Sequence, residues 1–144
     1  MEDRFALVSA VHLLLFDGDG RVLLLRRANT GYEDGNLSVP AGHLDGDETV
    51  RAASVREALE EIGVTLDLGD LAVALVMHRR SDDERIDFFV TCRRWTGSPV
   101  NAEPHKCAEL LWCDPTRLPD DVVPYVRAGI EHVAAGDTYA EFGW

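Results

Sequence analysis

Hydrophobic and polar positions divide the chain into short, well-separated segments. Residues 7–16 and 21–27 are rich in aliphatic side chains and are separated by the sequence DGDG, a strong turn signal. This pattern predicts two strands joined as a β-hairpin. Residues 28–40 contain two Gly, two Asn and one Pro, so they are predicted to form a loop.

The most regular segment runs from Thr49 to Ile62, where neither Gly nor Pro interrupts the chain. Asp47 or Thr49 can cap its first turn and Gly63 can end it, so we predict an α-helix. One apolar stripe at helical spacing is formed by Val55, Ala58, Leu59 and Ile62. We expect this stripe to pack on the body of the protein.

Two more strands are predicted over residues 71–79 and 85–95, and the polar sequence RSDDE between them favours a second hairpin. A short strand is expected near AELLWCD, residues 108–114, and a final helix over residues 121–135. The sequence shows no repeat, low-complexity stretch or linker. We therefore predict a single α/β domain over residues 1–144.

Composition and charge restrict the partners. The 144 residues are 46% hydrophobic, which is enough for one sizeable core. The 26 acidic residues outnumber the 14 basic ones, and the formal net charge of -12 repels polyanions. We therefore expect neither duplex nucleic acid nor a membrane as a partner. A small phosphorylated substrate would need a metal ion or local arginines at its site.

Three cysteines give a hint about location. Cys92, Cys107 and Cys113 are odd in number and show no C-x-x-C spacing, so they indicate neither a disulfide framework nor a zinc site. Reduced thiols and the lack of a cleavable apolar segment at the start of the sequence favour a cytoplasmic protein.

Three carboxylates gather within five positions of the predicted helix, at Glu57, Glu60 and Glu61. At about 100° per residue these positions face one side of the helix, so their charges are neighbours. A solvated acidic face would explain such a cluster taken alone. Hard cations such as Mg²⁺ and Mn²⁺ prefer carboxylate oxygens and often bridge protein acids to substrate phosphates, so a metal site is the alternative.

The spacing around the cluster favours the metal site. Residues 42–64 fit the pattern G-x5-E-x7-R-E-U-x-E-E-x-G-U, where U is an aliphatic residue. This pattern resembles the Nudix box, and the chain is similar to the MutT-like Nudix hydrolases. Two departures are Ala58 at the first U position and Leu37 where a Trp often precedes the box. The resemblance implies an α/β/α sandwich with a mixed central sheet.

The resemblance also implies a divalent metal cofactor, Mg²⁺, for which Mn²⁺ can substitute. Its implied ligands are the backbone carbonyl of Gly42 and the side chains of Glu48, Glu57, Glu60 and Glu61. Glu48 would be a secondary ligand or an anchor of the fold. Arg56 would orient the carboxylates by pairing with Glu60 or Glu48.

Residues outside the box complete the implied site. In the MutT-like branch another Glu, on a later loop, contributes to metal binding or water activation. Glu103 is the candidate, and Glu109 is the alternative. Arg26 and Arg27 end the second predicted strand, where the branch often places a phosphate-contacting Arg, although a solvated strand end would explain them equally well. His43 could reach a metal-bound phosphate. The implied catalytic residues are therefore Glu57, Glu60, Glu61 and Glu103.

The resemblance implies hydrolysis of a nucleoside diphosphate linked to another moiety, with water attacking phosphorus. A nucleoside triphosphate or a related small nucleotide is the favoured substrate, and a nucleotide sugar is an alternative. Another alternative is a non-catalytic module that senses a nucleotide, although such modules usually lose box glutamates and none is lost here. An isomerase of the isopentenyl diphosphate type is disfavoured, because its catalytic Cys motif is not recognisable. Homodimers are common among such relatives.

Overall fold

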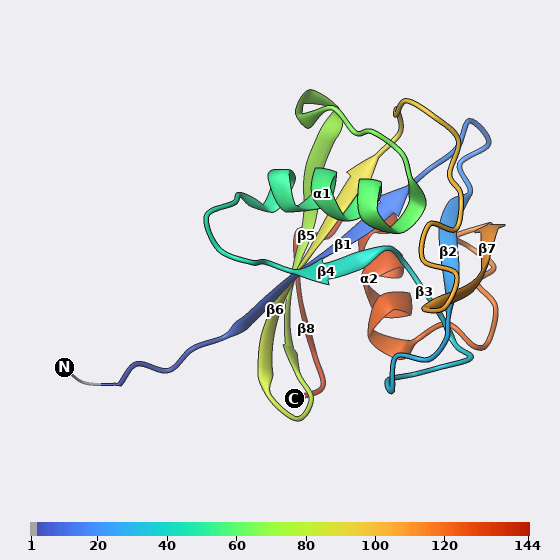
Figure 1. The fold of residues 1–144 in the computed structure, drawn as a ribbon. Helices are drawn as coiled ribbons and strands as arrows, with labels where there is room; N and C mark the ends of the chain where they lie inside the picture. The colour runs from blue at the N-terminus through green and yellow to red at the C-terminus, as the bar shows by residue number, and fades with distance from the viewer. Residues whose placement is uncertain (1–2) are drawn as a thin grey trace.

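The computed structural model describes residues 3–144, which form two α-helices, one short 3₁₀ helix and eight strands. The helices are α1 (Val50–Ile62), η1 (Leu68–Asp70) and α2 (Pro124–Ala134). The strands are β1 (Val8–Leu15), β2 (Val22–Arg27), β3 (Leu37–Ser38), β4 (Ala41–His43), β5 (Leu71–Arg80), β6 (Glu84–Cys92), β7 (Cys107–Cys113) and β8 (Tyr139–Phe142). Figure 1 shows α1 and α2 as separate layers with strands between them.

The strands form two sheets. The larger sheet has the order β4-β1-β6-β5-β8 and is mixed, because β1 runs parallel to β6 and β5 runs parallel to β8, whereas the other two pairs are antiparallel. The smaller sheet, β3-β2-β7, is antiparallel. This arrangement confirms the predicted α/β/α sandwich with a mixed central sheet.

Two apolar clusters hold the layers together. One includes Ala58 and Ile62 from α1, and the other includes Val126 and Ile130 from α2. Each cluster buries one face of the larger sheet, so β1 contributes alternate residues to both. No helix within residues 3–144 is long and apolar enough to cross a bilayer.

The first predicted hairpin is wrong, although its turn exists. The Asp17 carboxylate accepts hydrogen bonds from the backbone N–H groups of Asp19 and Arg21, which closes the DGDG turn. Beyond a single bridge between Phe16 and Val22, the two strands separate into different sheets. Both edges of β1 are occupied by β4 and β6, and both edges of β2 by β3 and β7. Strands 71–80 and 84–92 do form the second predicted hairpin.

The predicted boundaries of α1 are confirmed, and its predicted apolar stripe packs on the core through Val55, Ala58 and Ile62 but not through Leu59. Thr49 caps the first turn by accepting a hydrogen bond from the Ala52 N–H, and Gly63 ends the helix in the left-handed conformation with φ 68°. Leu59, placed in the apolar stripe, is 56% exposed, whereas Glu57 is only 8% exposed. The acidic side of the helix faces β4, where the Ala41 N–H donates to Glu61 and Arg56 donates to Glu57.

Candidate active site

Four carboxylates surround one cavity of about 500 Å³. Glu57, Glu60 and Glu61 reach it from α1, and Glu103 reaches it from the loop that precedes β7. The structure therefore brings together residues that are more than 40 positions apart in the sequence. Glu109, the alternative to Glu103, does not line this cavity.

Arg56 fixes the carboxylates at one side of the cluster. Its guanidinium donates to Glu57 Oε1 at 2.7 Å, and to Glu48 Oε1 and Oε2 at 2.7 and 3.0 Å. Glu60 Oε2 lies 3.5 Å from the same guanidinium. The bidentate bond from Arg56, with a further bond from the Asp45 N–H, lowers the pKa of Glu48 to about 2. Glu48 thus holds Arg56, and Arg56 orients the two box glutamates.

Glu61 lies on the less compensated side of the cluster. Its Oε2 accepts a hydrogen bond from the Ala41 N–H at 2.9 Å. Burial raises the pKa of Glu61 to about 9, and the negative charge of Glu57 adds to this effect. Burial likewise raises the pKa of Glu57, although the bond from Arg56 opposes the change. A cation bound beside these groups would favour their ionised forms and so lower both pKa values.

The donor set fits a hard divalent cation, because carboxylate oxygens are the ligands that Mg²⁺ and Mn²⁺ prefer. The carboxylates are not yet arranged around one point: within residues 3–144, no three His, Cys, Asp or Glu side chains are close enough to hold a metal ion as they stand. Glu57 is held by Arg56 and Glu61 by Ala41, while Glu60 is 55% exposed at its side chain.

Gly42 is the point where β4 approaches the acidic helix. A Cβ added to this residue would lie 2.7 Å from Glu57 Oε2 and closer still to Oε1 and the carboxyl carbon. Any side chain here would displace the Glu57 carboxylate. Glycine at this position therefore allows the carboxylate of α1 to lie against the backbone of β4.

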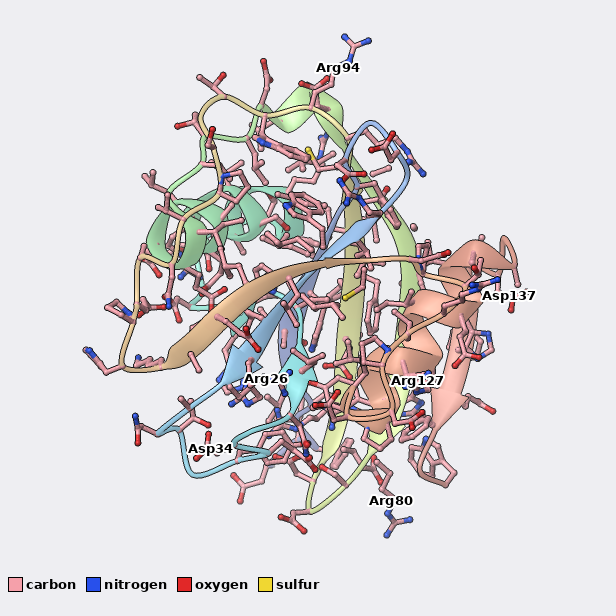
Figure 2. All side chains as sticks on the ribbon, turned by 90° about the vertical axis from the view of Figure 1, so that its right-hand side faces the viewer. Arg26, Asp34, Arg80, Arg94, Arg127 and Asp137 are labelled. Atoms are coloured by element: carbon pink, nitrogen blue, oxygen red, sulfur yellow. The ribbon has the colours of Figure 1, made fainter. Side chains whose placement is uncertain are left out.

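The two predicted phosphate-binding arginines occupy different environments. Arg27 lines the carboxylate cavity. Arg26 does not line this cavity, and its guanidinium is held by Glu109 at 2.8 Å and by Asp121 at 2.7 Å. Figure 2 shows Arg26 near the end of β2, whereas Arg80 and Arg94 project away from the body. Of the pair, only Arg27 is placed to contact a ligand in the cavity.

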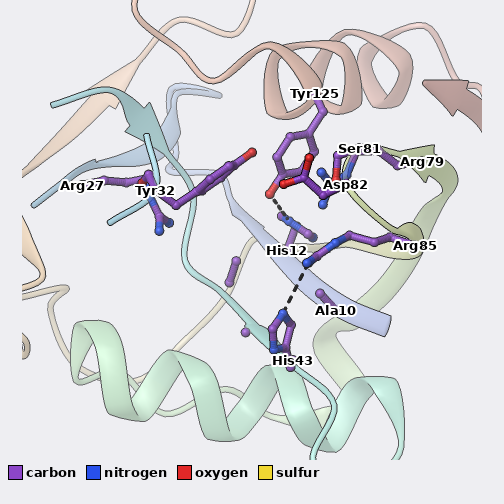
Figure 3. Close-up of a pocket in the computed structure, with 12 residues that line it drawn as sticks. Ala10, His12, Arg27, Tyr32, His43, Arg79, Ser81, Asp82, Arg85 and Tyr125 are labelled. Carbon is purple, nitrogen blue, oxygen red and sulfur yellow. Dashed lines mark hydrogen bonds between the residues drawn. The ribbon is translucent and has the colours of Figure 1, made fainter. Parts of the chain in front are cut away.

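A second cavity of about 450 Å³ adjoins the first, and both are lined by Arg27 and Ala41 (Figure 3). His43 lines this second cavity, as does Gly42. Sequence reasoning did not identify His12, Arg85 or Tyr125, which also line this cavity. One signal was present: His12 is the only ionisable residue in the apolar run LVSAVHLLLF, which indicates a polar side chain that is buried and paired.

The comparisons with known proteins agree with this fold. Residues 6–133 match the family model of the NUDIX domain. The chain belongs to the Nudix family. Within that family it is MutT-like, as the box pattern predicted: it is 30% identical over 112 residues to a putative 8-oxo-dGTP diphosphatase of Bacillus subtilis (strain 168), which covers 78% of this chain and 70% of that protein.

Other similarities broaden the range of relatives. The chain is 32% identical over 124 residues to an isopentenyl-diphosphate Delta-isomerase of Clavibacter michiganensis subsp. michiganensis (strain NCPPB 382), covering 76% of this chain and 61% of that protein. It thus spans less than two thirds of the isomerase. A crystal structure of a MutT NUDIX hydrolase from Burkholderia pseudomallei matches in fold with a TM-score of 0.79 and 24% identity, covering 88% of this chain and 98% of that one.

Proposed function

We propose that the chain is a metal-dependent pyrophosphohydrolase that cleaves a nucleoside diphosphate linked to another moiety. The favoured substrate is a nucleoside triphosphate or a related small nucleotide, and a nucleoside monophosphate is the expected product. The observation that carries the proposal is the gathering of four carboxylates around one cavity that adjoins a second cavity with room for an organic group. The diphosphate would lie where the two cavities meet, beside Arg27.

Each residue has a distinct proposed role. The backbone carbonyl of Gly42 and the carboxylates of Glu57, Glu60 and Glu61 would hold Mg²⁺ or Mn²⁺. A bound divalent cation lowers the pKa of water and polarises phosphoryl oxygens. Glu48 acts through Arg56, which it holds by two hydrogen bonds.

Three further residues would act on the substrate and on water. Glu103 would accept a proton from the attacking water, and Lys106, whose Nζ lies 3.7 Å from Glu103 Oε2, would hold that carboxylate in place. Arg27 would contact the diphosphate. His43 would contact the part of the substrate that lies in the second cavity. These roles support in-line attack at a phosphorus held between the two cavities.

A second candidate function is isomerisation of isopentenyl diphosphate. It is favoured by the similarity to the Clavibacter isomerase and by the position of Cys107, the one cysteine that lines the carboxylate cavity. Burial raises the pKa of the Cys107 thiol, and its Sγ donates to the Glu109 carbonyl at 3.3 Å. NMR can follow the conversion of isopentenyl diphosphate to dimethylallyl diphosphate and so tests this candidate. If the wild type catalyses this conversion and Cys107→Ser abolishes it, the isomerase would displace the hydrolase proposal.

The location and assembly of the protein are also proposals. Three free thiols, at Cys92, Cys107 and Cys113, support a cytoplasmic location. A homodimer is the expected assembly by analogy with relatives, and sedimentation velocity measures it directly. The formal net charge of -12 supports a small phosphorylated ligand bound with a cation rather than a nucleic acid duplex or a membrane.

The central experiment is a phosphate-release screen over nucleotides, nucleotide sugars and dinucleotides, with Mg²⁺ or Mn²⁺ and with chelator. We expect metal-dependent turnover that Glu60→Gln lowers by about 100-fold, because a misplaced or missing group in a reacting site costs at least that much. Glu131→Gln is the matched control, since Glu131 is exposed on α2. Equal inactivity of wild type and Glu60→Gln on every compound, with nucleotides still bound, would instead establish a binding module.

A further inference from the structure

The second cavity has a buried polar floor that the proposed reaction does not use. His12 and Asp87 are 2% and 0% exposed, and Arg79 is 5% exposed. Together with Tyr125 they come from four different elements, β1, β6, β5 and α2. Figure 3 shows His12 between Tyr125 and Arg85. Burial of such polar groups costs free energy of folding unless they are paired.

The floor is fixed by a chain of contacts. Arg79 Nε donates to Asp87 Oδ2 at 2.6 Å, and the Arg79 guanidinium lies over the Tyr125 ring at 3.6 Å from its centroid. The Tyr125 hydroxyl and His12 Nε2 are 2.9 Å apart. The His12 ring stacks on Phe89 with a centroid distance of 4.9 Å. None of these side chains can rotate without breaking a contact with its neighbour.

This chain of contacts leaves hydrogen-bonding capacity unused. His12 Nδ1 is buried and has no hydrogen-bond partner. Asp87 Oδ1 lies 3.9 Å away, too far for a hydrogen bond but close enough to favour the tautomer with a proton on Nδ1. His12 Nε2 then accepts from the Tyr125 hydroxyl, and the Tyr125 oxygen keeps its lone pairs for a ligand. Burial lowers the pKa of His12 to about 4 and raises that of Tyr125 to about 12, so both are neutral at pH 7.

We propose that His12 and Tyr125 are specificity-determining residues that select a hydrogen-bonding heterocycle in the second cavity and reject an apolar chain. The inference rests on the proposed function, which places the diphosphate beside Arg27 and the organic group in this cavity. His12 Nδ1 is buried beside Asp87, so His12 acts through Tyr125 by accepting from its hydroxyl. A heterocycle that carries an N–H donor can bond the Tyr125 oxygen, which lines the cavity. An alkyl chain would cover the Tyr125 oxygen without offering it a donor.

The size of the preference follows from that difference. A site whose polar groups must be paired rejects ligands that lack the pairing groups far more strongly than an apolar site rejects an added hydroxyl. The second cavity also has Arg85 at its mouth, with Nη1 3.4 Å from His43 Nε2, which adds donors rather than apolar surface. We therefore expect wild type to bind the preferred nucleoside monophosphate at least about 10-fold more tightly than isopentenyl monophosphate.

Three variants separate hydrogen bonding from shape. His12→Phe keeps a ring that can stack on Phe89 and removes both nitrogens. Tyr125→Phe keeps the ring beneath Arg79 and removes the hydroxyl. His12→Gln retains an amide that can still accept from Tyr125 and should restore part of the preference. The matched control is His132→Gln on α2, where the imidazole is partly exposed and contacts Asp137 at 2.7 Å.

Binding of nucleoside monophosphates and of isopentenyl monophosphate is measured by calorimetry without metal, and kcat and KM are measured for the best substrate of the screen. We expect His12→Phe and Tyr125→Phe to raise KM about 10-fold with little change in kcat, and to reduce the binding preference toward equality. His132→Gln should match wild type. Thermal unfolding identifies any variant that fails to fold, and Tyr125→Phe then carries the test alone.

The outcomes distinguish this inference from the proposed function. A folded His12→Phe and a folded Tyr125→Phe that keep the wild-type preference would overturn it, as would a wild type that prefers isopentenyl monophosphate. A preference that is present in wild type and lost in both variants would uphold it, even if no compound in the screen were hydrolysed. In that case only the hydrolase proposal would fail.

Discussion

Replacing Gly42 by Ala perturbs the site through a single methyl group. The new Cβ would lie 2.7 Å from Glu57 Oε2 and closer to the other atoms of that carboxyl group. Since non-bonded heavy atoms are most stable about 3.5 Å or more apart, the carboxylate must move by about 1 Å or more. Glu57 is 8% exposed and is bonded to Arg56 at 2.7 Å, so the movement breaks a charge-assisted hydrogen bond.

The magnitude for stability follows from two opposing effects. Loss of a hydrogen bond between charged groups costs about 1.5–3 kcal/mol, and the smaller conformational freedom of Ala in the unfolded chain offsets about 0.5–1 kcal/mol. We therefore expect Gly42→Ala to lower the free energy of unfolding by about 1–2 kcal/mol. Activity should suffer more, because a displacement of about 1 Å in a reacting site costs about 100-fold in kcat.

The assays separate these effects. Urea unfolding followed by circular dichroism gives the stability change, calorimetry gives the affinity for Mn²⁺, and turnover of the best substrate gives kcat. Gly18→Ala is the control, because no heavy atom lies within 4 Å of a Cβ added there. If Gly42→Ala kept both kcat and Mn²⁺ affinity within about twofold of wild type, the close approach of β4 would not set the position of Glu57 and the reasoning would be refuted.

Two other predictions concern Glu103 and His12. Glu103→Gln should lower kcat by about 100-fold or more, whereas Glu109→Gln should leave kcat unchanged because Glu109 is paired with Arg26 outside the cavity; equal effects of the two in the turnover assay would exclude Glu103 as the base. Burial lowers the pKa of His12 from 6.5 to about 4, despite the opposing charge of Asp87, so between these pH values the unfolded chain binds more protons. The stability contributed by neutral His12 is therefore complete above pH 6.5 and is lost, by roughly 3 kcal/mol, as the pH falls to about 4. Urea unfolding at pH 7 and pH 4.5 should show a larger loss for wild type than for His12→Phe, and parallel losses would contradict this assignment.

The sequence predicts local structure well where local chemistry decides it. Thr49 and Gly63 set the ends of α1 through capping bonds with residues at most four positions away. The first hairpin fails for the opposite reason, because the pairing of β1 with β6 depends on residues more than 70 positions later. An apolar run such as residues 7–16 indicates a strand buried on both faces, and it does not identify its neighbours.

The candidate site shows the same division. Residues 42–64 define the carboxylate cluster, because the fixed spacing of the box places its glutamates on one helix and Gly42 beneath them. Leu59 and Glu57 could not be assigned to the right faces from helical periodicity, because the close approach of β4 at Gly42 and the bond from Arg56 set the position of the Glu57 carboxylate. The second cavity could not be predicted at all, since its lining residues lie on strands and a helix that only the tertiary fold brings together.

The distribution of arginine partners explains how a chain with a net charge of -12 can accept a diphosphate. Arg56, Arg26 and Arg79 are each held by carboxylates, so their charges are already compensated and serve to orient other groups. Arg27 forms no ion pair within residues 3–144, and its guanidinium donates to the Tyr32 carbonyl and the Thr30 hydroxyl. It is therefore the arginine at the junction of the two cavities whose charge remains available. A single guanidinium cannot offset both a diphosphate and the neighbouring carboxylates, and so affinity for the diphosphate and affinity for a divalent cation must rise together.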